Sequence, residues 1–201
     1  MASRFLEPRL ERASRAEMTR LQRQRLRAQV AHAAAHSPFY RRKLRAAKVT
    51  PSAIRSLDDL RRLPFTTKDE LKDNQAAAPP WGDVLAVPFA DVLRIHMTSA
   101  TTGRPLAFLD TAEDWHGFYH SYARSLHAFG VRCADMVMAA FSYGPWIGYW
   151  SGFHAAQDLG CLVFPAGGLS TDQRIDALLG YPITVLGCTP SYALFLAEHA
   201  A

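Results

Sequence analysis

The sequence predicts an α/β protein in which a helical lead-in precedes a largely parallel sheet with flanking helices. Two observations support this class. Residues 1–73 carry helix-forming patterns joined by short turns, whereas from residue 74 onward short apolar runs alternate with helical patterns. Such alternation is typical of parallel sheets whose strands are connected by helices. We therefore expect an N-terminal helical segment, residues 1–73, and an α/β subdomain, residues 74–201.

The N-terminal segment is predicted from one long helix and several helix-start signals. Residues 16–35 lack Gly and Pro and are rich in Arg, Gln, Leu and Ala, which favours a helix with a narrow apolar face. Further starts are predicted by capping patterns, at Ser37-Pro38, at Ser56 with Asp59 and at Thr67 with Glu70. Leu63-Pro64 is expected to break the chain between the last two.

The α/β subdomain is predicted to alternate strands with helices. Short apolar or β-rich runs predict strands at residues 92–97, 106–109, 136–141, 161–164 and 183–186. Helical patterns lie at residues 147–159, 171–179 and from 190 to the C-terminus. Another helix is expected where Thr111 and Asp114 provide caps and aromatic residues from Trp115 to Phe129 recur at intervals of three and four.

Composition excludes several classes of protein. The 201 residues are 49% hydrophobic and 20% charged, which argues against disorder and fibrous repeats. No apolar run is long enough for a membrane span and no secretory signal is visible, so a cytoplasmic protein without membrane association is expected. The three cysteines form no CxxC pair, which argues against a zinc finger or a disulfide framework and predicts small buried residues.

The positive charge is concentrated in the N-terminal third. Residues 1–72 contain 18 Lys and Arg against 7 Asp and Glu, whereas residues 73–201 contain 5 against 11. A basic helical arm can bind nucleic acid through phosphate contacts. The arm has no zipper, zinc ligands or recognition-helix pattern, so a solvated helix face without a nucleic-acid partner is the favoured interpretation.

The most informative segment is TSATTGRP, residues 98–105. It follows one predicted strand and precedes another, and it combines four hydroxyls and small residues with one cation. These groups can cradle phosphate oxygens, although composition alone favours a polar hairpin turn. The segment contains neither the GxxxxGK[ST] of a P-loop nor the GxGxxG of a dinucleotide site.

Aromatic and histidine patterns mark two further candidates. Tyr143, Gly144 and Trp146 follow a predicted buried strand, and flat aromatic side chains there suit either an apolar ligand or the core. His116 and His120 stand one helical turn apart, a spacing that can chelate zinc. No cysteine or carboxylate near them in sequence completes a ligand set, so a polar helix face, and no metal site, is expected.

Several of these motifs, taken in order, resemble the phenylacetate-CoA ligase group of adenylate-forming acyl-ligases. Arg94-Ile95-His96 followed by TSATTGRP is similar to that group's RxHxSSGTTGKP phosphate loop. The resemblance extends from Ser37 onward, through SPFYRRKL (37–44), SLDDLRRLPFTTKDEL (56–71), Trp115 with Gly130 and Asp135, Ser142-Tyr143-Gly144 with Trp146, and Cys188-Thr189-Pro190-Ser191-Tyr192.

The resemblance implies a nucleotide site and a substrate pocket. The β- and γ-phosphates of ATP would be bound by Thr98, Ser99, Thr101, Thr102, Gly103 and Arg104. His96 would support that loop, and Tyr143, Gly144 and Trp146 would line the pocket for the acid. The implied reaction uses ATP and Mg²⁺ to convert an aryl or similar carboxylic acid to an acyl-adenylate, and then transfers the acyl group to coenzyme A. No residue is assigned a catalytic role.

The sequence departs from the family pattern in the loop and in length. Ala100 stands where the family has its central glycine, and Arg104 replaces the usual lysine. The later adenine, ribose and catalytic-lysine segments of the family are absent before Ala201. The chain is therefore interpreted as an incomplete fragment with weak or no turnover alone, completed by a missing C-terminal half or acting as a homodimer. The alternative is a non-catalytic nucleotide-binding or assembly module derived from the same scaffold.

Overall fold

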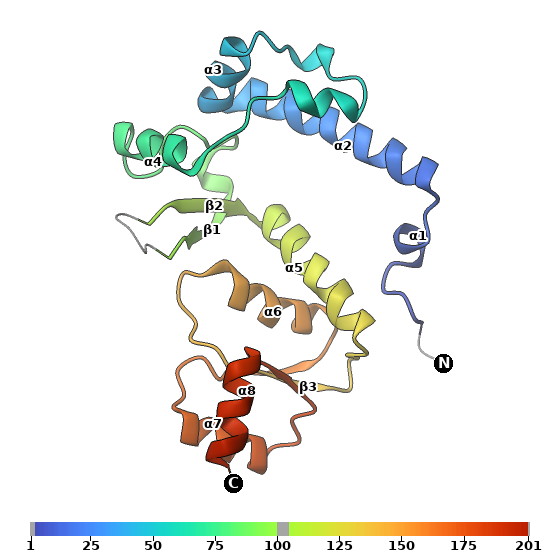
Figure 1. The fold of residues 1–201 in the computed structure, drawn as a ribbon, viewed down its shortest axis with the longest axis vertical. Helices are drawn as coiled ribbons and strands as arrows, with labels where there is room; N and C mark the ends of the chain where they lie inside the picture. Colours follow the sequence, from blue (N-terminus) through green and yellow to red (C-terminus); the bar gives the residue numbers. More distant parts are fainter. Residues whose placement is uncertain (1–2, 100–104, 201) are drawn as a thin grey trace. The chain divides into compact units, whose positions relative to one another are not determined.

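A computed structural model describes residues 3–99 and 105–200, and its chain forms two compact units (Figure 1). Residues Pro8–Ala112 form one, here called the hairpin unit. Residues Met1–Glu7 and Glu113–Ala201 form the other, here called the sheet unit. The predicted change at residue 73/74 follows composition, whereas the compact units divide after Ala112, so residues 74–112 belong with the helices before them.

The hairpin unit consists of helices followed by a two-stranded sheet. Its elements are α1 (Pro8–Glu11), α2 (Arg15–His36), α3 (Pro38–Ala46), the 3₁₀ turns η1 (Pro51–Ala53) and η2 (Asp58–Arg62), α4 (Lys68–Ala77), the 3₁₀ turn η3 (Phe89–Asp91), β1 (Val92–Met97) and β2 (Ala107–Thr111). A small core is formed by the buried side chains of Val30, Leu44, Val49 and Ile54. Burial of these apolar groups holds α2 against α3.

Capping side chains begin the helices of this unit as the sequence predicts. The hydroxyl of Ser37 accepts a hydrogen bond from the Tyr40 N–H at the start of α3, with Pro38 at the first helical position. Thr67 and Glu70 form a complete capping box on α4. Asp59 does not begin an α-helix. Its carboxylate accepts hydrogen bonds from the N–H groups of Arg55 and Ser56, and it lies within the 3₁₀ turn η2.

The sheet unit is built on three parallel strands. β3 (Met136–Ala139) lies between β4 (Leu162–Phe164) and β5 (Val185–Gly187). The helices are α5 (Ala112–Ala128, whose first residue belongs to the hairpin unit), α6 (Ile147–Asp158), α7 (Thr171–Gly180) and α8 (Pro190–His199). α6 packs against β3 and β4. The predicted α/β class, with its parallel sheet and flanking helices, is confirmed in this unit.

Two details of the sequence prediction need correction. β1 and β2 pair with each other in an antiparallel two-stranded sheet and are not part of the parallel sheet. A short connection can join antiparallel neighbours, whereas parallel neighbours need a long crossover. Of the three cysteines expected to be buried, Cys161 is buried, Cys188 is half-buried and Cys133 is exposed.

At the amino ends of the parallel strands, hydrogen bonds to one carboxylate connect β3 to β5. The Asp135 carboxylate accepts hydrogen bonds from the Arg132 N–H (2.6 Å) and from the Thr184 hydroxyl (2.7 Å). These bonds hold the pKa of Asp135 below its usual value. Asp135 therefore positions strands at the edge of the sheet opposite to the one where ligands of α/β proteins bind.

None of the helices in the described part of the chain combines the length and apolar character needed to cross a lipid bilayer.

Candidate functional site

The hairpin of β1 and β2 positions the start of the hydroxyl-rich segment. The Thr98 N–H donates to the Leu106 carbonyl at 3.0 Å, and the Thr98 hydroxyl oxygen accepts from the Leu106 N–H at 3.0 Å. Ser99, the next residue, is exposed. Of the predicted phosphate-binding residues, Thr101, Thr102, Gly103 and Arg104 lie outside the described residues, as does Ala100. The structure thus places Thr98 at the closed end of the hairpin and Ser99 in solvent.

Helix α4 braces the hairpin through Gln75. The Gln75 side-chain amide donates to the Ala107 carbonyl at 2.6 Å, and its oxygen accepts from the Ala107 N–H at 3.2 Å. Ala107 pairs with Met97 in the antiparallel register, next to the start of the hydroxyl-rich segment. Gln75 of the helical lead-in therefore fixes the position of β2 at Ala107, close to the end of the hydroxyl-rich segment.

His96 of β1, two residues before Thr98, is buried and contacts a carboxylate. It is 2% exposed, and its Nδ1 lies 2.5 Å from Oδ2 of Asp110. Asp110 pairs with Arg94 in the register, so the three side chains form a charged group within the two-stranded sheet. Burial lowers the pKa of His96 below its usual value, although Asp110 acts in the opposite direction. Burial and the neighbouring carboxylate thus act in opposite directions on the proton affinity of this imidazole, and burial has the larger effect.

In the sheet unit the predicted pocket residues follow the carboxyl end of β3. Tyr143 is half-buried; its hydroxyl donates to the Ala139 carbonyl at 3.2 Å, and its ring stacks on Trp150 of α6 with centroids 5.0 Å apart. The Trp150 indole N–H donates to the Gly144 carbonyl at 2.8 Å. Trp146 is half-buried at the N-cap of α6. These contacts connect Tyr143 and Gly144 to Trp150 of α6.

Sequence analysis missed Gly167, which follows β4 and makes room for Tyr143. A Cβ added at Gly167 would overlap the Tyr143 ring, whereas a Cβ at the neighbouring Gly168 would meet no atom within 4 Å. The absence of a side chain at Gly167 therefore allows the Tyr143 ring to lie directly on the backbone. The only sequence signal is a pair of glycines after a predicted strand, which indicates a turn and does not identify the ring.

Sequence analysis also missed Arg174, a buried cation of α7 that is 8% exposed. Its Nε and Nη2 both donate to the Ala166 carbonyl at 3.1 Å, and its Nη1 donates to the Tyr192 hydroxyl at 2.9 Å. Burial raises the pKa of Tyr192, but hydrogen bonds with Thr171 and Arg174 outweigh it and lower that pKa overall. Arg174 thus ties the segment after β4 to the helix that follows β5.

The three segments share one edge of the parallel sheet. Residues 140–146, 165–170 and 188–189 follow the carboxyl ends of β3, β4 and β5 respectively. In open α/β sheets, ligands bind outside the carboxyl ends of the strands. The Tyr143 segment, Gly167 and the start of α8 therefore lie where the topology places a binding site.

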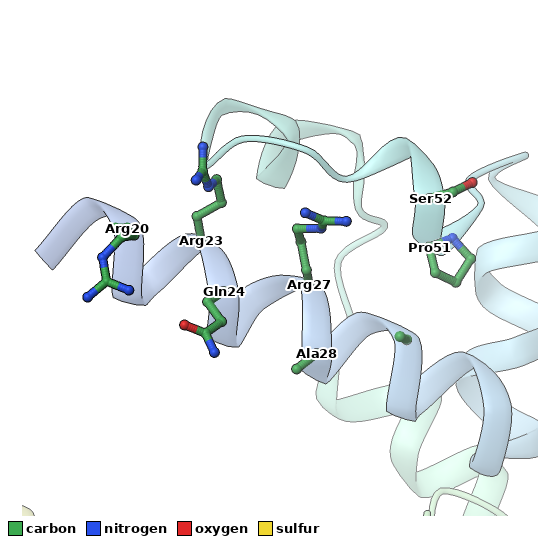
Figure 2. A pocket seen from close by; sticks show the side chains of 8 residues that line it. Arg20, Arg23, Gln24, Arg27, Ala28, Pro51 and Ser52 are labelled. Atoms are coloured by element: carbon green, nitrogen blue, oxygen red, sulfur yellow. The ribbon is translucent and has the colours of Figure 1, made fainter. Parts of the chain in front are cut away.

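A separate groove of about 570 Å³ lies in the hairpin unit along α2 (Figure 2). It is lined by Arg20, Arg23, Gln24, Arg27, Ala28, Ala31, Pro51 and Ser52. Figure 2 shows Arg23 and Arg27 directed toward the side of α2 where the following chain runs, while Arg20 points away. The groove contains none of the residues that the sequence assigns to phosphate or acyl binding.

Comparison with curated proteins confirms the resemblance seen in the sequence. No family model matches the chain. The chain is 39% identical over 194 residues to a phenylacetate-coenzyme A ligase of Aromatoleum evansii, a match that covers 96% of this chain and 43% of the relative. A phenylacetate-coenzyme A ligase of Thermus thermophilus is 39% identical over 193 residues, covering 96% of this chain and 42% of the relative. The matches correspond to the N-terminal portion of these proteins.

Solved structures give the same result for the fold. A 2-hydroxyisobutyryl-CoA ligase in complex with 2-HIB-AMP and CoA, in the thioesterification state, matches with a TM-score of 0.92 and 36% identity over 98% of this chain and 42% of that one. An open conformation of that ligase with the same two molecules matches with a TM-score of 0.91 and 35% identity, covering 98% of this chain and 46% of that one. The chain thus has the fold of the N-terminal part of an adenylate-forming ligase and spans about 43% of the length of the curated relatives.

Proposed function

We propose that this chain provides the phosphate-binding and acyl-binding parts of an enzyme that activates an aryl or similar carboxylic acid with ATP and transfers the acyl group to coenzyme A. The observation that carries the proposal is the match over 98% of the chain, at 36% identity, to a ligase whose structure contains an acyl-AMP and CoA. Because the chain spans about 43% of its curated relatives, the proposal assigns it a share of the reaction.

The hairpin unit is assigned to the nucleotide. Thr98, Ser99, Thr101, Thr102, Gly103 and Arg104 would hold the β- and γ-phosphates, since hydroxyls, backbone amides and one guanidinium match several anionic oxygens. The exposed hydroxyl of Ser99 is available to a ligand, and the hairpin fixes where the segment begins. Mg²⁺, when bound, would neutralise part of the phosphate charge. His96 supports the hairpin through Asp110 without reaching solvent.

The sheet unit is assigned to the acid. The stacked rings of Tyr143 and Trp150, together with Trp146, offer flat apolar surfaces at the carboxyl edge of the sheet, which suits an aryl group. In the proposed reaction a carboxylate oxygen attacks the α-phosphorus of ATP and pyrophosphate leaves with the electrons of the broken P–O bond. The CoA thiol then attacks the acyl carbonyl, releasing AMP and a proton.

A chimera tests the proposal. Residues 1–201 replace the matching N-terminal portion of the Thermus thermophilus relative, and exchange of labelled pyrophosphate into ATP is measured with phenylacetate and a panel of other acids. We expect exchange that depends on the acid. Arg104→Met and Thr102→Val should lower it about 10- to 100-fold, the cost of losing one hydrogen bond to a charged group. A folded chimera that exchanges with none of the acids would contradict the proposal.

Ala100→Gly separates the enzyme from the alternative of a module that has lost its chemistry. In an active chimera, restoring the glycine of the family loop should increase ATP affinity if the backbone at that position needs a conformation that alanine resists. If ATP binding by the 201-residue chain and exchange by the chimera both stay undetectable with alanine and with glycine, the non-catalytic module is favoured.

A further inference from the structure

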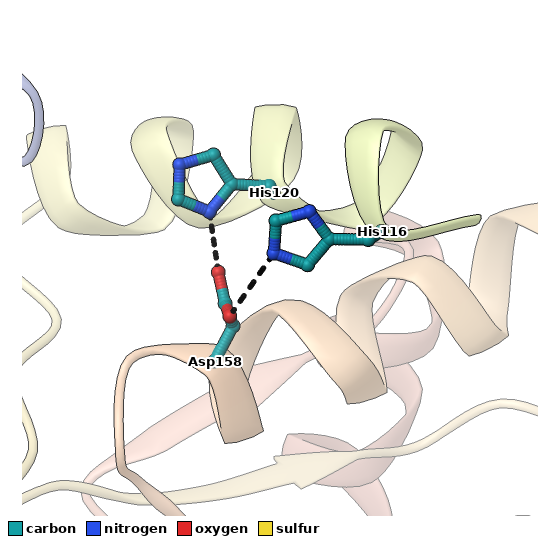
Figure 3. A group of neighbouring side chains, drawn as sticks. All are labelled: His116, His120 and Asp158. Atoms are coloured by element: carbon teal, nitrogen blue, oxygen red, sulfur yellow. Dashed lines mark hydrogen bonds and ion pairs between the residues drawn. The ribbon is translucent and has the colours of Figure 1, made fainter. Parts of the chain in front are cut away.

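Two histidines and a carboxylate converge on the surface of the sheet unit (Figure 3). His116 and His120 lie one turn apart on α5, and Asp158 is the last residue of α6. The His120 Nδ1 lies 2.5 Å from Oδ2 of Asp158, and the His116 Nε2 lies 4.0 Å from its Oδ1. One ligand atom from each residue falls within 4.8 Å of the others. The carboxylate that the sequence analysis does not find near the histidines is thus supplied by a residue 38 positions after His120.

The chemistry of this group suits a divalent transition metal. Two imidazole nitrogens and one carboxylate oxygen are a ligand set of zinc sites that keep a fourth position for water. Zinc bonds of about 2.0–2.2 Å to nitrogen and oxygen place ligand atoms a little over 3 Å apart. The present nitrogen–oxygen separations of 2.5 and 4.0 Å are respectively shorter and longer than that spacing, so the side chains rotate when an ion binds.

The His120 ring is also held from its other side. Oε2 of Glu7 lies 3.5 Å from the His120 Nε2 and accepts a hydrogen bond from the Arg124 guanidinium at 2.9 Å. In metal sites a carboxylate on the distant ring nitrogen fixes the orientation of the ligating histidine. Glu7 thus directs the Nδ1 of His120 toward Asp158 before any ion binds.

The group is accessible to solvent, and its histidine rings contact neighbouring rings. The His116 side chain is 57% exposed, while those of His120 and Asp158 are 27% and 23% exposed, so an ion can enter from solvent and then be partly enclosed. The two imidazole rings stack with centroids 5.3 Å apart, and the His116 ring also packs edge-on against Tyr119. These contacts reduce the side-chain entropy that ion binding would otherwise cost.

We propose that His116, His120 and Asp158 form a binding site for a zinc-like divalent metal ion, which links α5 to α6, with Glu7 orienting His120. The bonds form from the His116 Nε2, the His120 Nδ1 and an Asp158 oxygen to the ion. A proton carried on the His120 Nδ1 passes to solvent when that nitrogen binds the ion. The site uses none of the residues proposed to bind phosphate or acid, and it stands whether or not the proposed ligase function does.

Titration of the 201-residue chain with Zn²⁺ tests the site. By calorimetry we expect one ion per chain with micromolar or tighter affinity, and thermal unfolding should shift upward by several degrees when Zn²⁺ is in excess. Co²⁺ should bind in its place and produce visible absorption bands characteristic of a four-coordinate nitrogen and oxygen site. Absence of binding at 100 μM Zn²⁺ would overturn the proposal.

Variants assign the ligands. His116→Ala, His120→Ala and Asp158→Asn should each weaken Zn²⁺ binding at least 10-fold and abolish the thermal shift. His116 is mostly exposed, so its removal leaves the fold intact even if another variant unfolds. Glu7→Gln should weaken Zn²⁺ binding less, because Glu7 only orients the His120 ring and is not itself a ligand.

The matched control is the second histidine pair of the chain. His32 and His36 also stand one turn apart, on α2, with ring centroids 4.7 Å apart, and both are exposed. Among the described residues, the group of three possible metal ligands contains His116 and His120 but neither histidine of this second pair. Replacing both by Ala should leave Zn²⁺ binding unchanged. If this control loses the ion while His116→Ala and Asp158→Asn retain it, the proposed site is wrong.

Discussion

The two candidate segments of this chain are supported in opposite ways. In the hairpin unit, the hydroxyl-rich segment is held by backbone pairing at Thr98, its first residue, and the next residue, Ser99, is exposed. In the sheet unit, the segments after β3 and β4 are held by the buried side chain of Arg174 and by close packing of Tyr143 on Gly167. The difference implies that a substitution at Ser99 should cost little stability, whereas a substitution around Tyr143 should change both the predicted pocket and the packing that holds its segments.

The largest expected effect comes from Arg174. Arg174→Met keeps the apolar stem but leaves the buried Ala166 carbonyl without its two donors, which should destabilise the protein by about 3 kcal/mol. Urea unfolding followed by tryptophan fluorescence measures the change. Arg174→Lys serves as the control, since it keeps the charge but not the planar fork, and should recover part of the loss. Equal stability of Arg174→Met and the parent would contradict the comparison.

Gly167→Ala is expected to cost about 2 kcal/mol, because the added methyl must displace the Tyr143 ring from its stack on Trp150. Gly168→Ala is the matched control and should be nearly neutral, since nothing lies within 4 Å of its added carbon. Unfolding in urea gives the energies, and near-ultraviolet circular dichroism reports the aromatic rearrangement. If both substitutions behave alike, the packing argument fails.

His96 predicts a pH dependence specific to the hairpin unit. Burial lowers its pKa in the folded state, so the unfolded chain binds a proton more readily as the pH falls below about 6.5. Stability is thus retained at higher pH and lost on acidification, with a slope of at most about 1.4 kcal/mol per pH unit from this group. Urea unfolding between pH 7.5 and 5 should show a smaller slope in His96→Gln. Identical slopes would refute the assignment.

The smallest effect on stability is expected at Ser99. Because the side chain is exposed, Ser99→Ala should change the free energy of unfolding by less than about 0.5 kcal/mol. If the proposed function is correct, the same change should weaken ATP binding several-fold by calorimetry. A substantial loss of stability with unchanged ATP binding would reverse the contrast between the two segments.

Local patterns in the sequence predict much of this structure. The helix starts at Ser37 and Thr67 are correct because a capping side chain acts within three residues of itself. The three parallel strands were predicted because each of them contains a short apolar run. The polar hairpin turn offered for residues 98–105 agrees with the antiparallel pairing of β1 with β2, whereas the wider expectation of a largely parallel sheet did not set these two strands apart.

The candidate site is predicted less completely, for a related reason. Tyr143 and Trp146 can be located from the strand before them, but their support comes from Gly167 and Arg174, which are brought near by the order of the sheet. Asp158 reaches His120 only through the packing of two helices. The local sequence around a carboxylate or a glycine does not indicate which distant ring that residue will contact in the fold.

The pairing of Gln75 with Ala107 has a consequence for association between molecules. A two-stranded sheet exposes backbone amides and carbonyls along its outer edges, and such edges can recruit a strand from another chain. At Ala107 the outer edge of β2 already bonds to a side-chain amide with the same donor and acceptor as a peptide group. Gln75 therefore takes the place of a neighbouring strand at that position and protects the ribbon from intermolecular pairing there.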